Sequence, residues 1–267
     1  MSRVRLIASI AAVAVVATPA AAQAKTTISL SGSTSVAPLA RSLAKKYATV
    51  DRSLSFKLLQ GGSDTGINDV SRGRVTIGNA SRDPQSSDPG GLVFNKIARD
   101  AVCIITHPNN PIANLSQDQV QAIFSGRVRS WSQVPGARSK GAISLISRTA
   151  ASGTGDAFKS IFMGPNLNVA ASSSAKNSNG LVNQSVRSDS DAIGFVSLDF
   201  VKGVSAAGYK GVPCSLRNAK SGQYGGTRNF WMVTRGKASG KAAAWIRWIQ
   251  NSSAARRIVS TDWISIR

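Results

Sequence analysis

The sequence predicts an α/β protein, because short runs typical of strands alternate along the chain with runs typical of helices. Without residues 1–24, roughly 240 residues remain, which is enough for one large core or two smaller ones. Three of the expected strands lead into turns rich in Ser, Gly and Thr, at residues 31–35, 61–66 and 152–155. Ligands of open α/β sheets gather at such strand ends.

The strands and helices are expected in the following order. Strands are expected at residues 27–31, 54–59, 75–78, 101–106, 143–147, 192–196 and 230–234. Helices are expected at residues 36–47, 117–124 and 242–258, with Ser116 as the N-cap of the second, and the turn at 152–155 leads into another helix.

Residues 1–24 have the organisation of a secretory signal peptide. Arg3 and Arg5 precede an apolar run at 6–18, and small residues offer cleavage after Ala22 or Ala24. A membrane anchor is the alternative, but the apolar run is short for a span. The first cysteine is far from these sites, so no lipid attachment at the mature N-terminus is expected. The mature protein is therefore expected in the periplasm.

The chain is strongly basic. Its formal net charge is +21, and removing residues 1–24 leaves +19, because that segment contains two arginines and no acid. Such a charge raises nucleic acid, anionic surfaces and small anions as partners. However, the basic residues are scattered and the aromatic residues are not interleaved with them, as binding of single strands would need. Nucleic acid is therefore not an expected partner, and the charge is explained more simply by a field that steers anions or by an unusual external medium.

The two cysteines and the single histidine say little about chemistry. Cys103 and Cys214 pair if both are oxidised after export, but Cys103 lies in an apolar run and fits a buried free thiol equally well. His107 has no neighbouring ligand set with metal-binding spacing. No metal and no cofactor are expected.

The segment RTAASGTGDAF at residues 148–158 has the pattern of an oxyanion clamp. Ser152 and Thr154 offer hydroxyl donors, Gly153 permits close backbone approach, and the following helix offers N–H groups without intrahelical partners. Arg148 adds a planar fork that matches two oxygens of a phosphate-like anion. The alternative is an ordinary Ser N-cap with Arg148 in solvent, but three such turns on a basic exported chain favour anion binding.

Further motifs follow one another along almost the whole mature chain. They are ISLSGSTSVAPL at 28–39, QGGSDTGI at 60–67, VTIGNASR at 75–82, LSQDQVQAIFSG at 115–126, the segment 147–158, AIGFVSL at 192–198 and RNFWMVTRG at 228–236. In this order, the motifs resemble those of the phosphate-binding proteins that serve phosphate ABC transporters. The resemblance implies a two-lobed periplasmic-binding-protein fold of type II, with a ligand cleft between the lobes. Lobe 1 would hold residues 25–100 and 227–267, lobe 2 residues 101–226, and crossing strands near Ala101 and Phe230 would form the hinge.

The resemblance also implies which residues hold the ligand. Lobe 1 would supply hydroxyls and amides from its first two turns, and lobe 2 an arginine with the Ser-Gly-Thr. In this sequence those residues are Thr34, Ser35, Ser63, Arg148, Ser152, Gly153 and Thr154.

One position departs from the family pattern. The best-known phosphate binders have Asp directly after the Ala-Ser that follows the third strand, where this chain has Arg82. Hydrogen phosphate carries an O–H donor, so a carboxylate acceptor favours it over sulfate. The acceptor must then be another carboxylate, for which the acids are Asp64, Asp83 and Asp156, or be absent. Arg82 either joins the site or lies solvated near the cleft.

The function expected is capture of inorganic phosphate, or a related tetrahedral oxyanion, by a monomer that delivers it to the permease of an ABC transporter. Secreted polyanion or surface binding, and phosphate sensing on the same fold, are the alternatives. An enzyme is not expected, because Ser152 lies in ASGTG rather than GxSxG and the single His107 is followed by two prolines, Pro108 and Pro111.

Overall fold

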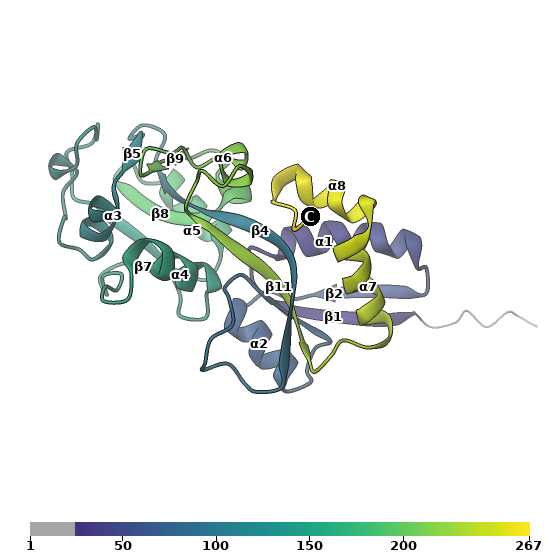
Figure 1. Ribbon diagram of the computed structural model, residues 1–267. Coiled ribbons are helices and arrows are strands. Elements are labelled where there is room, and N and C mark those ends of the chain that lie inside the picture. The colour runs from purple at the N-terminus through teal and green to yellow at the C-terminus, as the bar shows by residue number, and fades with distance from the viewer. Residues whose placement is uncertain (1–24) are drawn as a thin grey trace, which may run out of the picture.

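A computed structural model describes residues 25–267 as an α/β protein of two lobes joined by two long crossing strands (Figure 1). The strands are β1 (Thr26–Gly32), β2 (Leu54–Leu58), β3 (Ile77–Ala80), β4 (Leu92–Thr106), β5 (Asn114–Leu115), β6 (Ser144–Arg148), β7 (Ser174–Lys176), β8 (Ala192–Ser197), β9 (Ser205–Ala206), β10 (Gly208–Tyr209) and β11 (Thr227–Arg235). The α-helices are α1 (Ala37–Val50), α2 (Ser63–Ser71), α3 (Gln117–Phe124), α4 (Gly153–Phe158), α5 (Asn179–Arg187), α6 (Leu216–Lys220), α7 (Gly240–Asn251) and α8 (Ser253–Asp262).

The main sheet runs through both lobes in the order β2-β1-β3-β11-β4-β8-β6-β7, with β9 also paired to β4. In lobe 1, β1 pairs in parallel with β2 and β3. Helices α1, α7 and α8 share one apolar cluster with one face of this sheet, and α2 packs through Ile67 and Val70 in a separate cluster. Lobe 1 is therefore a sheet covered on both faces, so the parallel strands β1 and β3 are buried.

Lobe 2 is built around β4, β8 and β6 and has its own apolar core. Four phenylalanines from different elements pack ring against ring at its centre, with the rings of Phe158 and Phe195 stacked at a centroid distance of 3.9 Å. Their burial fixes α4 on this lobe, which positions the turn that precedes the helix.

Strands β4 and β11 pass from one lobe to the other as an antiparallel pair (Figure 1). β11 also pairs with β3 of lobe 1, and the other end of β4 pairs with β8 of lobe 2. Their register shifts between Phe230 and Trp231, and Arg228 lies directly opposite Asp100. Such a bulge locally increases the twist of the pair, and the pairing places both charged residues where the lobes meet.

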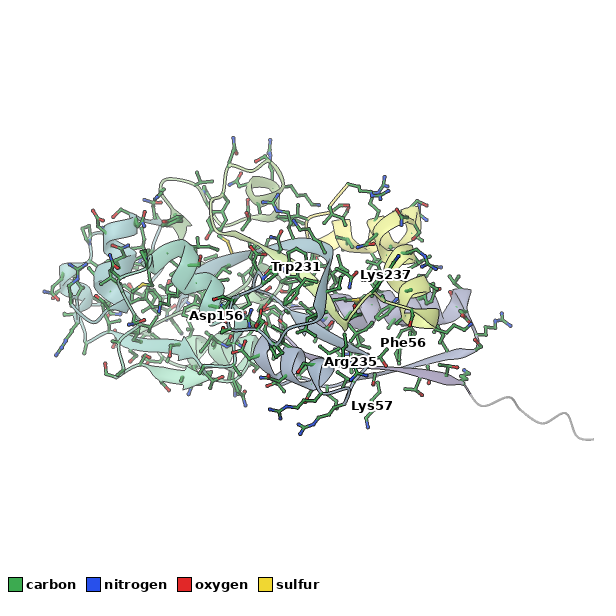
Figure 2. All side chains as sticks on the ribbon, turned by 60° about the horizontal axis from the view of Figure 1, so that its bottom comes forward. Phe56, Lys57, Asp156, Trp231, Arg235 and Lys237 are labelled. Atoms are coloured by element: carbon green, nitrogen blue, oxygen red, sulfur yellow. A yellow bond between two sulfur atoms is a disulfide. The ribbon has the colours of Figure 1, made fainter. Side chains whose placement is uncertain are left out.

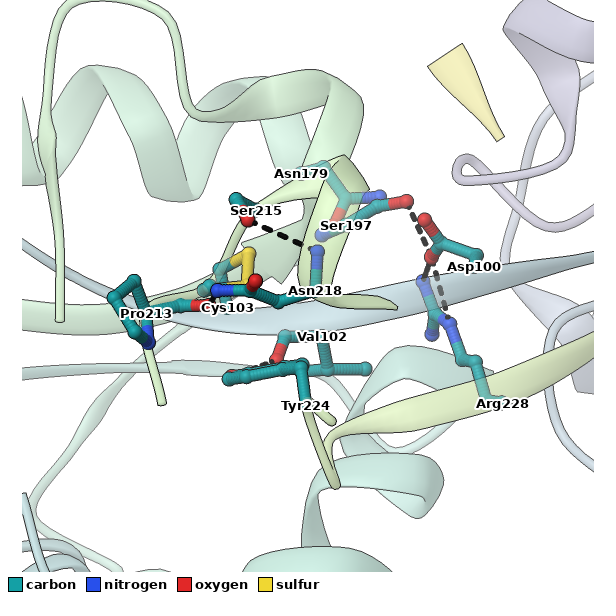
Figure 3. The surroundings of a disulfide bond; sticks show 11 residues. Asp100, Val102, Cys103, Asn179, Ser197, Pro213, Ser215, Asn218, Tyr224 and Arg228 are labelled. Atoms are coloured by element: carbon teal, nitrogen blue, oxygen red, sulfur yellow. Dashed lines mark hydrogen bonds and ion pairs between the residues drawn. A yellow bond between two sulfur atoms is a disulfide. The ribbon is translucent and has the colours of Figure 1, made fainter. Parts of the chain in front are cut away.

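A disulfide joins Cys103 of β4 to Cys214, with the two Cα atoms 5.7 Å apart (Figure 3). The choice left open by the sequence, between a bridge and a buried thiol, is thus decided in favour of the bridge. Nearby, the Tyr224 hydroxyl donates to the Val102 carbonyl at 2.8 Å. The chain is therefore tied to β4 on both sides of α6, by Cys214 before the helix and by Tyr224 after it.

Most expected elements are present, with shifted ends. The third strand, expected at 75–78, lies at Ile77–Ala80, and the strand expected at 101–106 is the C-terminal part of the 15-residue β4. Helices α2, α5 and α6 were not expected. The region 242–258 is divided into two helices by Ser252, which has an extended conformation.

The expectations for export concern residues 1–24, which lie outside the described residues. Among residues 25–267, no helix is long and apolar enough to cross a membrane. The same residues contain no group of three or more His, Cys, Asp or Glu side chains arranged to hold a metal ion.

Candidate functional site

Four helix beginnings meet where the lobes face each other. Helices α1 and α2 come from lobe 1, and α4 and α5 come from lobe 2. Contacts across the boundary join them: Ser35 Oγ and Thr154 Oγ1 are 2.9 Å apart, and Asn179 Nδ2 donates to Ser35 Oγ at 2.8 Å. Helix N-termini present N–H groups and a partial positive charge. Their convergence therefore favours an anion.

The first turn of lobe 1 holds its polar side chains inward. Thr34 and Ser35 are buried. The turn is fixed by Ser33, whose Oγ accepts from the Ser35 and Val36 N–H groups and donates to Ser81 Oγ at 2.9 Å. Gly32 has a φ of +126°, where a Cβ would overlap the backbone of Asn79. The SGSTS segment is thus shaped to bring hydroxyls to the lobe boundary.

The second turn supplies Ser63, which is the first residue of α2 and is fully buried. Ser63 Oγ accepts from the Ser81 N–H at 3.0 Å. Gly153 of lobe 2 faces these two serines, because a Cβ on Gly153 would overlap Ser63 Oγ and come within 3.0 Å of Ser81 Oγ. Close approach of the lobes at this point therefore requires glycine at position 153.

Lobe 2 supplies Arg148 and the Ser-Gly-Thr turn. Ser152 is the N-cap of α4, and its Oγ accepts from the Gly155 N–H at 3.2 Å. The N-cap interpretation is therefore correct for Ser152, but the second half of that alternative is wrong, because Arg148 is only 9% exposed. Arg148 donates to Thr34 Oγ1 at 3.3 Å across the lobes and to Asn179 Oδ1 at 3.3 Å.

Two residues that were not predicted from the sequence join this group. Arg228 of β11 donates to Ser35 Oγ at 2.8 Å and to the Ser81 carbonyl at 3.3 Å. Asn179, the first residue of α5, donates to both Thr34 and Ser35. The motif containing Arg228 was noticed in the sequence, but only the strand pairing brings position 228 opposite Asp100 and next to the first turn.

Arg228 is held by a buried carboxylate. Asp100 Oδ2 accepts from Arg228 Nε at 3.0 Å and Nη2 at 2.8 Å, and from Ser197 Oγ at 2.6 Å (Figure 3). Asp100 is 1% exposed and Arg228 is 6% exposed. A guanidinium fixed in this way presents its remaining N–H groups in one direction, toward Ser35 and Ser81.

The site carries more positive than negative charge. Burial, with the neighbouring charge of Arg228 adding to it, lowers the pKa of Arg148 to about 9. Within residues 25–267, Arg148 forms no ion pair with a carboxylate, while Arg228 pairs with Asp100. A buried, unpaired positive charge is costly unless an anion offsets it. The electrostatics of the site therefore favour an anionic ligand.

Arg82 is placed differently from the other predicted site residues. It is 5% exposed, so it is not a solvated surface arginine. Its guanidinium donates to Asp64 at 2.9 Å and to Asp88 at 2.6 Å, and it also lies 3.2 Å from Asp156. The structure thus brings together Thr34, Ser35, Ser63, Arg148, Ser152, Gly153 and Thr154, and directs the Arg82 N–H groups to carboxylates and to the Asp83 carbonyl.

The three acids considered as acceptors for a ligand proton have other contacts. Asp64 is bonded to Arg82, and Asp156 lies against it. Asp83 accepts from Asn229 at 2.7 Å and from Trp231 at 3.0 Å. The carboxylate bonded directly to the donor group is instead Asp100, through Arg228.

Fold and site together define a two-lobed solute-binding protein with an anion site between its lobes. A family model described as a PBP superfamily domain matches residues 17–253, and this chain belongs to that family. The match confirms the resemblance recognised in the sequence motifs.

Individual proteins similar to this chain are named as phosphate-binding or phosphate-transport proteins. The phosphate-binding protein PstS of Bacillus subtilis (strain 168) is 25% identical over 245 residues, covering 89% of this chain and 80% of that protein. A structure from Clostridium perfringens, assigned as a phosphate ABC transporter substrate-binding protein with bound phosphate, has a TM-score of 0.85 at 30% identity, covering 91% of this chain and all of that chain. An ABC-type phosphate transport receptor from Vibrio cholerae has a TM-score of 0.74 at 28% identity over 90% of this chain and all of its own.

Proposed function

We propose that this protein captures inorganic phosphate between its lobes and delivers it to the permease of an ABC transporter. The observation that carries the proposal is the pair of buried guanidiniums, Arg148 and Arg228, where four helices begin. Of the two, only Arg228 pairs with a carboxylate among residues 25–267, that of Asp100. The bound phosphate of the Clostridium perfringens relative supports phosphate as the anion. The net positive charge of the whole chain would steer the anion toward the cleft.

The ligand contacts that we propose come from both lobes. Lobe 1 offers Thr34, Ser35 and Ser63, and lobe 2 offers Arg148 with the turn 152–154. To the set expected from sequence we add Arg228 and Asn179, which touch Ser35. Arg82 is left out of the direct contacts, because its hydrogen bonds go to Asp64, Asp83 and Asp88.

Capture would proceed by closure of the lobes on the anion. Residues 25–100 with 227–267 would move as lobe 1 and residues 101–226 as lobe 2, with β4 and β11 as the hinge. Hydroxyls and guanidiniums held by buried partners need little rearrangement when the anion arrives. The protein is proposed to act as an exported monomer without catalytic activity, with the signal peptide removed after Ala22 or Ala24 and the mature protein in the periplasm.

Calorimetric titration with phosphate, sulfate and molybdate tests the ligand. We expect phosphate to bind with a 1:1 stoichiometry, and the order of the three affinities to show whether selectivity survives without the family's Asp at position 82. Absence of binding by all three anions would refute the proposal. Hydrolysis of a generic phosphomonoester by the purified protein would refute its non-catalytic part.

A further inference from the structure

Arg82 sits at the centre of a cluster of carboxylates. Asp64 comes from the first turn of α2, Asp88 from the loop after β3, and Asp156 from α4. The Arg82 guanidinium hydrogen-bonds Asp64 through Nε and Nη2 and Asp88 through Nη1 and Nη2. Its hydrogen-bonding capacity is thereby spent on these two acids and the Asp83 carbonyl.

The cluster joins the two lobes. Arg82, Asp64 and Asp88 belong to lobe 1, while Asp156 precedes Ala157 and Phe158, which are buried in the core of lobe 2. Figure 2 shows Asp156 where the lobes meet. The Asp64 N–H also donates to the Ala151 carbonyl at 3.2 Å, so the lobes touch directly beside the cluster. Separation of the lobes would therefore remove Asp156 from Arg82, but leave Asp64 and Asp88 in place.

Among the carboxylates around Arg82, Asp156 is the one whose negative charge is least well compensated. Its Oδ2 lies 3.2 Å from Arg82 Nε, yet among residues 25–267 no donor forms a hydrogen bond with this buried oxygen. The charged groups facing Asp156 are Asp64 and Asp88, which repel its charge, and Arg82 and Lys159, which attract it. Burial, with repulsion from Asp64 next, raises the pKa of Asp156 to about 6. The closed arrangement therefore favours a protonated Asp156.

We propose that Asp156 is a proton-linked latch between the lobes, so that closure on the anion takes up a proton and the anion is held more tightly in acid. This inference rests on the proposed function, because it supposes that the lobes close on phosphate. In the open protein Asp156 would lie in solvent, near the ordinary carboxyl pKa of 3.8. Between about pH 4 and pH 6 the closed form thus binds the additional proton, and raising the pH through 6 weakens closure.

Asp156→Asn tests the latch, because Asn mimics the protonated acid at every pH. We expect this variant to bind phosphate more tightly than wild type at pH 8, and the ratio of wild-type to variant Kd to fall about tenfold between pH 8 and pH 5. Taking this ratio at each pH cancels the ionisation of phosphate itself. Asp83→Asn is the matched control, because Asp83 bonds Asn229 and Trp231, and its ratio should stay constant.

A second variant acts on the same carboxyl without replacing it. Asp64→Asn removes the nearest repelling charge, so the pH at which affinity changes should move to lower values. Proton uptake, measured by calorimetry in buffers of different ionisation enthalpy, should near pH 5 be larger for wild type than for Asp156→Asn by more than about half a proton.

The outcomes separate the two proposals. Suppose that wild type binds phosphate, but that the ratio of wild-type to Asp156→Asn Kd is the same at pH 8 and pH 5 and the two proteins take up equal numbers of protons. The latch is then refuted and the phosphate function stands. If wild type binds no phosphate at either pH, both are refuted. If thermal unfolding shows that Asp156→Asn is misfolded, the Asp64→Asn variant decides. If its phosphate affinity changes at the same pH as that of wild type, the latch is overturned.

Discussion

At the scale of single residues, the site is defined by buried charge. Arg228 and Asp100 form an ion pair that is almost wholly removed from water. Arg148 lies nearby and has no carboxylate partner within residues 25–267. Such groups are expensive to bury, so they are expected where an anion completes the balance of charge. The stability of the protein and its binding of anions therefore depend on the same side chains.

Replacing Arg228 tests this dependence. Arg228→Gln leaves Asp100 buried without its partner, and the free energy of unfolding should fall by about 3 kcal/mol. The measurement is denaturant unfolding followed by circular dichroism. Adding Asp100→Asn should recover part of the loss, because the uncompensated charge is removed. If Arg228→Gln alone is as stable as wild type, the assignment of a buried ion pair is contradicted.

Gly153 gives a second prediction at this scale. A Cβ at 153 would overlap Ser63 Oγ of the opposite lobe, so Gly153→Ala should weaken phosphate binding by about tenfold or more while each lobe stays folded. Gly155→Ala is the control, because its Cβ would meet Arg148 Cβ at an ordinary 3.5 Å. Equal phosphate Kd values for the two variants, measured by calorimetry, would argue against close contact of the lobes here.

At the scale of elements, the sequence predicted what local patterns determine. Ser116 as an N-cap and the patterns at 36–47 and 117–124 predicted helices close to their observed ends, and the structure adds that Ser116 forms a capping box. Helix α2 was missed because QGGSDTG reads as a turn, although Ser63 begins a helix. Only residues 101–106 of β4 were expected, since residues 92–100 are not continuously apolar. The strand continues through 92–100 because β11 pairs with them.

The site residues also divide into those that local motifs predicted and those that only the tertiary structure brings together. Thr34, Ser35, Ser63, Arg148 and the turn at 152–154 stood in recognisable motifs, and the structure places them together. Arg228 and Asn179 were missed because strand register and helix packing, which are not local in sequence, bring them there. The ion pairs of Arg82 were likewise invisible, because Asp64, Asp88 and Asp156 are distant from one another along the chain.

The disulfide between Cys103 and Cys214 yields a prediction at the scale of elements. It closes a loop with a sequence separation of 111 residues within lobe 2, so breaking it should reduce the free energy of unfolding by about 2–5 kcal/mol. Thermal unfolding with and without a reductant measures the effect. The Cys103→Ala/Cys214→Ala variant should not respond to the reductant, and a reductant-insensitive wild type would contradict the bridge.

At the scale of the whole molecule, the basic surface and the cleft respond differently to salt. Exposed charges are screened, whereas donors enclosed between the lobes are screened much less. Binding of a polyanion such as heparin should therefore weaken at least about tenfold between about 50 and 200 mM salt. The calorimetric phosphate Kd should change by less than about threefold. If the affinities for heparin and for phosphate fall by the same factor, the polyanion-binding alternative is favoured over the cleft.

The central claim is that phosphate is gripped between the lobes with Arg148 as a charge partner. Its most direct test is calorimetric titration of phosphate into wild type, Arg148→Ala and the control Arg127→Ala, whose side chain is exposed on lobe 2. We expect wild type and Arg127→Ala to bind equally and Arg148→Ala to lose about 100-fold or more in affinity, as for a buried charge-assisted contact. Unchanged phosphate affinity in Arg148→Ala would contradict the claim.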